Sequence, residues 1–274
     1  MNTSPATTSV RPRAPSANER AHAGPNPRDL VAGLESGLAV ICAFDQDRPR
    51  LSTTEVARRC GLTRAAARRH LITLEHLGFM RSERGTWALS AKVLRLAQSY
   101  MHSGRLPRIV QPELHKLAQA LKEASSAGVL DGDDVICIAA LSAGRLVSST
   151  LQPGTRVPAY CTANGRVLLA ALRPAEADAW IGTRTFERLT PKTLTRPDRL
   201  RAELARVRTQ GYAAVDQELE PGLRTLAVPL LSFDGDVLAA INISVHAAHM
   251  SMEQLVDTCL PALRQTQATL RHLL

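Results

Sequence analysis

The segment "GLTRAAARRHLITLEHLGF", residues 61–79, decides the interpretation of the N-terminal part of the chain. It places three arginines and a histidine between Arg64 and His70, and its second half is apolar. Thr63 is a suitable N-cap and Gly78 a suitable end, so the segment predicts a helix. On that helix Ala67, Leu71 and Leu74 share one face at helical spacing, and the arginines lie on others. We therefore expect an apolar anchor and a basic binding surface on one helix.

The flanking residues predict a winged helix-turn-helix around this segment. The preceding "LSTTEVARRCG", residues 51–61, reads as a capped helix, because Ser52 and Glu55 have capping-box spacing and Gly61 can end it. The following "FMRSERGTWALS", residues 79–90, reads as a β-hairpin with a charged turn. In this arrangement the second helix enters the DNA major groove with its N-terminal half, and the hairpin forms the wing.

Arginine in the first turns of that second helix points to DNA, because its guanidinium group grips guanine or phosphate with two hydrogen bonds. The alternative is a solvated face, but arginines near a helix N-terminus oppose the helix dipole, which disfavours a purely structural role. Arg58 and Arg59 on the preceding helix are equally compatible with DNA-backbone contact and with a solvated face. The predicted DNA-binding residues are Ser52, Thr63, Arg64, Ala65, Arg68, Arg69 and Arg84.

Charge is distributed unevenly along the 274 residues, whose formal net charge is +9. Residues 1–105 hold 16 Lys/Arg and 8 Asp/Glu, whereas residues 106–274 hold 18 and 17. One domain only is thus expected to bind an anionic partner. Aromatic residues make up 3% of the chain, which disfavours a single-strand binder that stacks bases.

The rest of the chain predicts an α+β domain. Hairpin signals occur at Asp131-Gly132 and Asp234-Gly235, between helical segments, and the chain closes with a helix pair or one broken helix. We expect a disordered tail over 1–27, the winged helix-turn-helix over 28–89, a linker helix over 90–105 and a second domain over 106–274. The tail arginines Arg11, Arg13 and Arg20 either brush DNA or are simply solvated.

Several function classes find no support in the sequence. There is no apolar run long enough to span a membrane and no apolar signal segment, so a cytoplasmic protein is expected. The five cysteines are widely spaced, which disfavours a disulfide framework. GxGxxG, P-loop, GxSxG and HExxH motifs are missing, and we expect no enzyme, cofactor or metal. His246 with His249, the aspartates at 131–134 and Cys161 are read as structural or turn residues.

Several separated blocks resemble the IclR family of bacterial transcription regulators, in the family's order from residue 28 to the end. They include "LESGLAVICAF" (34–44), "VLDGDDVICIA" (129–139), "GTRVPAYCTANGRVLLA" (154–170) and "RTQGYAAVDQELEPGLRTLAVPL" (208–230), together with the segment 48–79. The likeness is greatest to the branch that regulates protocatechuate, 4-hydroxybenzoate and β-ketoadipate catabolism. It departs from that branch in the "TANG" turn, in "SVHAAHM" and at His70.

The resemblance implies a C-terminal GAF-like effector domain, binding of a small aromatic or dicarboxylic acid, and homodimers or dimers of dimers on double-stranded operator DNA. By the same resemblance, the effector pocket is formed by Thr162, Ala163, Asn164, Asp216, Thr225, Asn242 and Ser244. An alternative is a second domain that only dimerises, or one that senses a non-aromatic metabolite.

The residues themselves support this pocket in part. A helix N-terminus at 162–164 suits a carboxylate, although a simple capped helix is the plainer explanation. Asn242 and Ser244 share one face of an apolar strand, where they bond each other or a ligand. Arg224 is expected to pair with Glu218 or Glu220 rather than with an effector. Asp216 near an acidic ligand requires a ligand hydroxyl or a protonated carboxyl.

Overall fold

The computed structural model describes residues 26–45, 47–142 and 151–274, and the predicted N-terminal tail lies almost entirely outside this range. The chain divides into two compact units, one ending at Leu96 and the other beginning at Ala97. Each unit is described by itself below. The predicted domain boundaries at residues 89 and 105 remain predictions.

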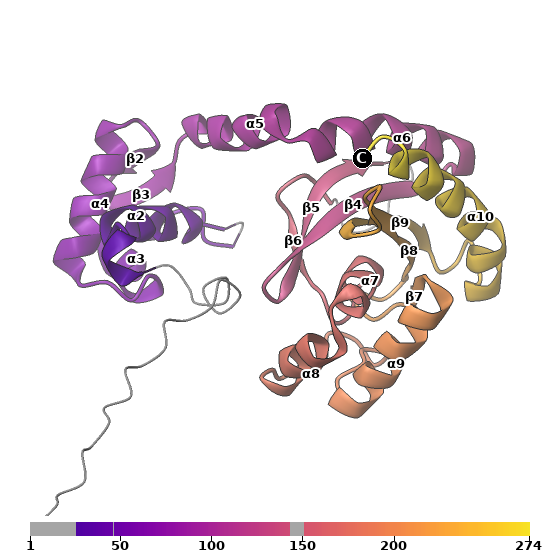
Figure 1. Cartoon of the computed structure of the whole chain (residues 1–274). Coiled ribbons are helices and arrows are strands. Elements are labelled where there is room, and N and C mark those ends of the chain that lie inside the picture. The colour runs from indigo at the N-terminus through magenta and orange to yellow at the C-terminus, as the bar shows by residue number, and fades with distance from the viewer. Residues whose placement is uncertain (1–25, 46, 143–150) are drawn as a thin grey trace, which may run out of the picture. The chain divides into compact units, whose positions relative to one another are not determined.

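The first unit is a small helical domain with a three-stranded antiparallel sheet of order β1-β3-β2 (Figure 1). Its helices form a core around the buried side chains of Val40, Leu51, Val56 and Leu71. Its elements are η1 (Pro27–Asp29), α2 (Ala32–Cys42), β1 (Leu51–Ser52), α3 (Thr53–Arg59), α4 (Arg64–His76), β2 (Met80–Glu83), β3 (Thr86–Leu89) and η2 (Ala91–Val93).

Helix α4 has the two faces expected from its sequence. Ala67, Leu71 and Leu74 are its buried residues, whereas the arginines of its first two turns are exposed. The hairpin is present as β2 and β3, and Arg84 and Gly85 form its two-residue turn. Both have positive φ, 51° and 80°, as a type I′ turn requires. Strand β1, which pairs with β3, was missed because two residues carry no period-two pattern.

The second unit contains a six-stranded sheet of order β6-β5-β4-β9-β8-β7, in which every pair of neighbours is antiparallel. This sheet and its helices confirm the α+β class. Helix α5 (Leu94–Ser103) begins at the end of the first unit. The other elements are α6 (Arg105–Leu121), β4 (Ala124–Asp131), β5 (Asp134–Leu141), β6 (Arg156–Pro158), α7 (Ala163–Ala171), α8 (Pro174–Gly182), α9 (Pro197–Gln210), β7 (Ala213–Asp216), β8 (Leu223–Leu231), β9 (Val237–His246) and α10 (Met252–Arg271).

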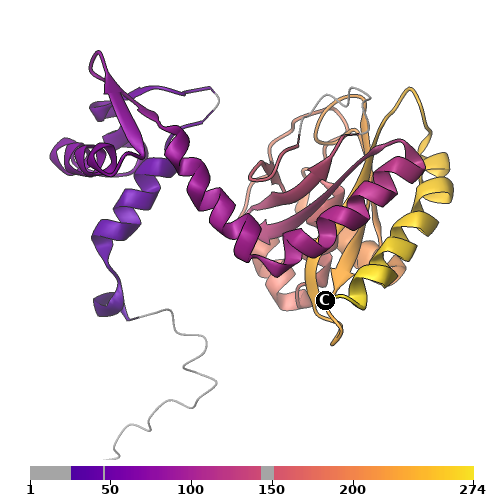
Figure 2. The same ribbon diagram turned by 90° about the horizontal axis from the view of Figure 1, so that it is seen from above.

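Helices cover both faces of this sheet, giving three layers. Helices α6 and α10 pack on one face over a core that includes Ile138, Leu226 and Ile241 (Figures 1 and 2). Helices α7, α8 and α9 cover the other face, over a core that includes Val135 and Ala227 (Figure 1). Because strand residues alternate between faces, the apolar side chains of the strands are divided between these two cores.

Three expectations for the second unit were wrong in detail. Helix α8 was missed, although Pro174 at its first turn and Glu176 are ordinary start signals. Strand β7 is likewise an element that the sequence analysis did not predict. The closing segment is one continuous helix, α10, with Pro261 inside it. Pro261 is exposed, so water can satisfy the carbonyl group that its missing N–H leaves unpaired.

Candidate DNA interface and effector site

The basic surface of α4 is available for a ligand. Arg64, Arg68 and Arg69 are exposed, and none of their guanidinium groups has an ion pair or hydrogen bond with the residues that the structure describes. Thr63 caps the helix, because its Oγ1 accepts a hydrogen bond from the Ala66 N–H at 3.2 Å. Ala65 is exposed beside the arginines and adds no bulk. The first turn contains no acidic residue, so the helix dipole and the arginines remain uncompensated.

Ser52 and the wing residues have more structural roles. The Ser52 hydroxyl accepts from the Glu55 N–H. The hydroxyl and the backbone N–H of Ser52 both donate to the Glu55 carboxylate, and these two bonds lower the pKa of Glu55. Contact of Ser52 with DNA stays a prediction. At the wing, Glu83 pairs with Arg50 at 2.7 Å, which leaves the exposed Arg84 as the available cation of the turn. On α3, Arg59 pairs with Asp45 at 2.6 Å, so a solvated, paired role fits Arg59.

A buried polar cluster lies on the sheet face under α7. Asn242 and Ser244 of β9 alternate with Ile241, Ile243 and Val245, which pack in the core under α6 and α10. The Asn242 Oδ1 accepts from the N–H and the hydroxyl of Ser126 on β4, at 3.1 and 2.6 Å. Its Nδ2 donates to the Ser244 Oγ at 3.3 Å. Thr225 on β8 lies opposite Ser244, so four polar residues of three strands share this face.

The start of α7 faces the same cluster with an unpaired acceptor. Asn164 is 7% exposed, and its Oδ1 is buried without a hydrogen-bond partner. A Cβ added to Gly128 of β4 would lie 2.4 Å from Val135 Cγ1 of β5, so glycine makes room for that side chain. The same Cβ would lie 3.5 Å from the Asn164 Nδ2, which places Asn164 beside β4. Thr162 caps α7 through the Gly165 N–H at 3.2 Å. Within the described residues, the N–H groups of Ala163 and Asn164 have no partner.

A buried ion pair that the sequence reading missed holds α7 in place. Arg166 is 2% exposed, and its Nη2 lies 2.6 Å from Glu218 Oε2. The Arg166 Nε donates to the Tyr160 carbonyl at 3.0 Å, and Glu218 also accepts from the Leu194 N–H at 2.8 Å. The signal available in the sequence was an arginine inside the apolar run "GRVLLAAL". Such a residue needs a partner when buried.

Asp216 is not brought into the polar cluster. On β7 it has Arg224 of β8 as its register partner, whereas its neighbour Val215 is the one that pairs with Thr225. Strand alternation therefore places Asp216 and Arg224 on the opposite face from Thr225. Arg224 donates to the Asp216 Oδ1 at 2.7 Å, and Lys192 also pairs with this carboxylate. The expected pairing of Arg224 with Glu218 was wrong, because Glu218 pairs with Arg166 and Arg224 with Asp216.

The Asp216 carboxyl is ionised. Burial alone would raise its pKa, but hydrogen bonds from Lys192, Arg224 and Gln217 outweigh burial and lower the pKa to about 2. A group whose folded-state pKa is depressed stabilises the fold above its unfolded pKa and loses that contribution as the pH falls through the folded value.

We therefore expect Asp216→Asn to be less stable than the parent protein at pH 7, by about 1 kcal/mol for a partly exposed ion pair. The difference should shrink between about pH 4 and pH 2, because the parent carboxyl then becomes neutral. Urea unfolding of both proteins at pH 7, 4 and 2.5 measures it. An equal difference at all three values would show that the charge of Asp216 contributes nothing.

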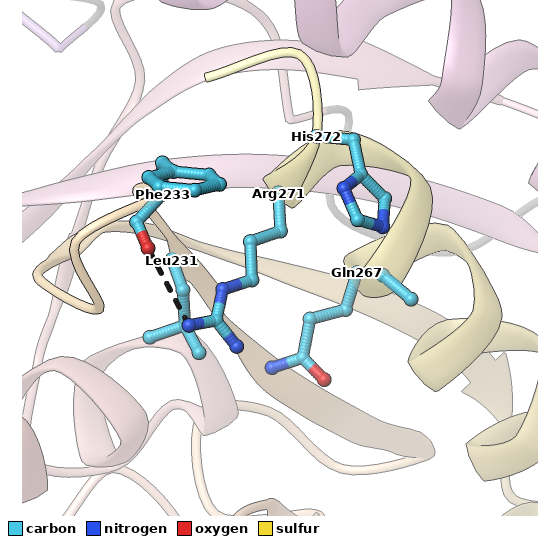
Figure 3. Close-up of a pocket in the computed structure, with 6 residues that line it drawn as sticks. Leu231, Phe233, Gln267, Arg271 and His272 are labelled. Carbon is cyan, nitrogen blue, oxygen red and sulfur yellow. Dashed lines mark hydrogen bonds between the residues drawn. The ribbon is translucent and has the colours of Figure 1, made fainter.

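The cavities described here lie away from the polar cluster. One of about 370 Å³ is lined by Leu231, Phe233, Gln267, Ala268, Arg271 and His272 at the end of α10 (Figure 3). A second of about 360 Å³ lies between α5 and strands β4 and β5, and a third of about 290 Å³ between α2 and α4. None of the seven predicted effector residues lines any of these three cavities.

The residues considered for other chemistry have structural partners. Burial raises the pKa of the Cys161 thiol to about 12, although Arg166 lowers it somewhat, so the thiol stays protonated. Asp131 and Asp134 pair with Arg156 at 2.5 and 3.0 Å. The described part of the chain contains no group of three His, Cys, Asp or Glu side chains placed to hold a metal ion. No helix in it is long and apolar enough to cross a membrane.

Two family models match the chain in the order that the two units require. The "IclR helix-turn-helix domain" matches residues 33–84, and "Bacterial transcriptional regulator IclR C-terminal" matches residues 98–272. The chain therefore belongs to the IclR family of bacterial transcriptional regulators. Its homologues are regulators rather than enzymes.

Particular relatives place it more closely. The chain is 40% identical to the "Pca regulon regulatory protein" of Pseudomonas putida, over 89% of this chain and 84% of the relative. It is 36% identical to the "p-hydroxybenzoate hydroxylase transcriptional activator" of Acinetobacter baylyi, over 89% of this chain and 92% of the relative. A putative regulator from Rhodococcus sp. RHA1 is similar in structure, with a TM-score of 0.77, 42% identity and coverage of 89% and 98%. The structure of an IclR homologue from Microbacterium hydrocarbonoxydans in complex with 4-hydroxybenzoate is also similar, with a TM-score of 0.74 and 25% sequence identity. The similarity covers 88% of this chain and 98% of the homologue. These relatives support the aromatic-acid branch of the family.

Proposed function

We propose that this protein controls aromatic-acid catabolic genes, binding operator DNA through α4 and an aromatic carboxylic acid between α7 and the sheet. The unpaired Asn164 Oδ1 carries the effector part of the proposal. A buried carbonyl oxygen without a donor costs about 1–3 kcal/mol, and a ligand hydroxyl or water would supply the missing hydrogen bond. Asn164 sits where α7 meets a sheet face already lined by polar groups, so a small polar ligand has several partners there.

The two ends of a hydroxybenzoate match the two kinds of group in this region. The N–H groups of Ala163 and Asn164, at the N-terminus of α7, suit a carboxylate, and the helix dipole adds to the attraction. The carbonyl oxygen of Asn164 accepts from a phenolic hydroxyl, and Ser244 and Thr225 can donate or accept. The cations nearest the site in sequence are occupied, because Arg166 pairs with Glu218 and Arg224 with Asp216. We therefore assign the carboxylate to backbone N–H groups rather than to an arginine.

The relatives support the same effector class. One similar structure holds 4-hydroxybenzoate, and two curated relatives are named for the pca genes and for p-hydroxybenzoate hydroxylase. The six residues that we assign to the effector site come from the start of α7 and from strands β8 and β9: Thr162, Ala163, Asn164, Thr225, Asn242 and Ser244. Asp216 is left out, because it lies on the opposite sheet face.

A thermal-shift screen tests the proposal with 4-hydroxybenzoate, protocatechuate, β-ketoadipate and a few non-aromatic acids. A ligand at about 100 times its dissociation constant stabilises the folded state by about 2.7 kcal/mol, which raises Tm by roughly 5–10 °C in a domain of this size. We expect that shift for one of the first three acids. The Asn242→Leu/Ser244→Ala double variant should lose it.

The matched control is Ile243→Val, which trims one methyl group on the same strand but on the α10 side. It should keep the ligand-induced shift. A normal shift in the Asn242/Ser244 variant would place the effector elsewhere in the protein. No shift with any acid would favour the alternative function, a second domain that only mediates self-association.

We also propose that the protein is a cytoplasmic homo-oligomer, a dimer or a dimer of dimers. Leu34 and Leu38 of α2 and Leu94 and Leu96 around α5 are about half exposed or more, and α5 has no buried residue. Apolar surface of this kind on a regulator suits contact with a second copy. Sedimentation equilibrium of the full chain measures the oligomeric state.

A further inference from the structure

We propose that Cys42 and Cys60 form a reversible disulfide, a thiol-oxidation site that ties α2 to the turn before the DNA-binding helix α4. Both cysteines are free thiols in the first unit. Neither takes part in the DNA-binding or effector sites proposed above. The inference stands on the contact that the Cys60 sulfur makes with α2, on the place of Cys42 in that helix, and on the exposure of both thiols.

The carbonyl group of Ala39 is contacted by one thiol and lies within reach of the other. The Cys60 Sγ contacts the Ala39 carbonyl oxygen at 3.6 Å. Cys42 follows Ala39 by three residues on the same helix, α2. A short side chain at position i of a helix reaches the carbonyl oxygens of residues i−3 and i−4. The Cys42 sulfur can therefore reach the same oxygen by rotation about χ1, which would bring it close to the Cys60 sulfur.

The two thiols differ in accessibility, which sets their order of reaction. Cys42 is exposed and Cys60 is half-buried. Burial raises the pKa of Cys60; Arg59 lowers it in part, and the neighbouring Cys42 raises it further. The influence of Cys42 on this pKa agrees with their closeness. Since the thiolate is the nucleophile, Cys42 reacts first with an oxidant and Cys60 resolves the product.

A peroxide is a sufficient oxidant, and the reaction balances. The Cys42 thiolate attacks one peroxide oxygen, the O–O bond breaks, and hydroxide leaves, which gives a sulfenic acid on Cys42. The Cys60 thiolate then attacks that sulfur, the S–O bond breaks, and a second hydroxide leaves as the S–S bond forms. The two hydroxides take the two thiol protons and become water. Two electrons pass from the thiols to the peroxide, and a dithiol returns them.

The bond would join two parts of the DNA-binding unit. Cys60 is the C-cap of α3, and Gly61 after it has φ of 64° and opens the turn to Thr63 and α4. The disulfide closes the loop of residues 42–60, which restricts the unfolded chain and stabilises the folded unit. Cys137, Cys161 and Cys259 are buried in the second unit and serve as internal controls.

The experiment treats the reduced full chain with a small excess of hydrogen peroxide, alkylates the remaining thiols in denaturant and digests with trypsin. We expect free thiols to fall from five to three per chain, and residues 29–50 to appear linked to residues 60–64. Dithiothreitol should restore five thiols. Thermal unfolding of the oxidised protein should begin several degrees higher than that of the reduced protein.

The two single variants keep the outcome interpretable. Cys60→Ser should leave Cys42 as a sulfenic acid that dimedone traps, whereas Cys42→Ser should leave Cys60 as a thiol. Peroxide treatment of the parent chain that yields peptides 29–50 and 60–64 unlinked, or Cys42 linked to a second chain, overturns the proposal.

Discussion

The single variants Arg64→Ala and Arg68→Ala are each expected to bind the operator about 10- to 100-fold more weakly than the parent protein. The reason is that each bidentate arginine–guanine contact contributes about 1–3 kcal/mol. Both side chains are exposed on the same face of α4 and have no partner among the described residues. If either contacts phosphate instead, its loss should weaken binding to all sequences alike and reduce the salt slope by about one. Fluorescence anisotropy with an operator selected from random DNA measures both effects at two salt concentrations.

The same variants separate DNA binding from folding. Removing positive charge from the first turns of α4 relieves an unfavourable interaction with the helix dipole, so the variants should be as stable as the parent or slightly more so. Arg199→Ala is the matched control, since Arg199 is an exposed helical arginine of the second unit. It should leave operator affinity unchanged. If Arg64→Ala and Arg68→Ala both bind like the parent, α4 does not read the DNA as described.

The largest effect on stability is expected from Glu218→Leu. It leaves the Arg166 guanidinium group buried without its carboxylate at 2.6 Å, and breaking a buried pair in this way costs about 3–5 kcal/mol. Tm of the second unit should fall by roughly 6–20 °C. Glu203, at 3.9 Å from Arg166, compensates only in part. Thermal and urea unfolding measure the change.

The double variant Arg166→Met/Glu218→Leu shows whether the loss comes from an isolated charge. Replacing both members of a buried pair with apolar residues of similar size is often neutral or stabilising. We therefore expect the double variant to be more stable than Glu218→Leu alone. The loss of stability in the double variant could instead equal the sum of the losses in Arg166→Met and Glu218→Leu. That result would mean that packing, and not the unpaired charge, causes the loss.

The DNA-binding unit was largely predictable from sequence, for a local reason. Its helices are short and amphipathic. Ser52 and Thr63 cap the starts of two of them, and Gly78 follows the end of the second. Its hairpin turn needs positive φ at Gly85. Each of these signals acts within a few residues, so the chain shows them without tertiary information. The resemblance to the IclR family added the identity of the second unit.

The proposed effector site was less predictable, because it depends on register between strands that are distant in sequence. The alternation of Asn242 and Ser244 placed them on one face correctly, but whether Asp216 shares that face depends on its pairing with Arg224 in β8. Edge strand β7 has only four residues, too few for a recognisable strand pattern in the sequence. Arg166 and Glu218 lie 52 residues apart in the chain, so no pattern within a few residues of either one predicts that they pair.

Strand β9 has a consequence for how such a regulator can diversify. Its even-numbered residues 242 and 244 face α7, whereas 241, 243 and 245 fill the core under α6 and α10. In the proposed effector site, substitutions at the two even positions change which chemical groups meet the ligand, while the three odd positions go on supporting the fold. Mutations that alter specificity and mutations that alter stability fall on different residues of one strand. With the effector site proposed above, a lineage can exchange one effector for another along β9 without first acquiring compensating changes in its core.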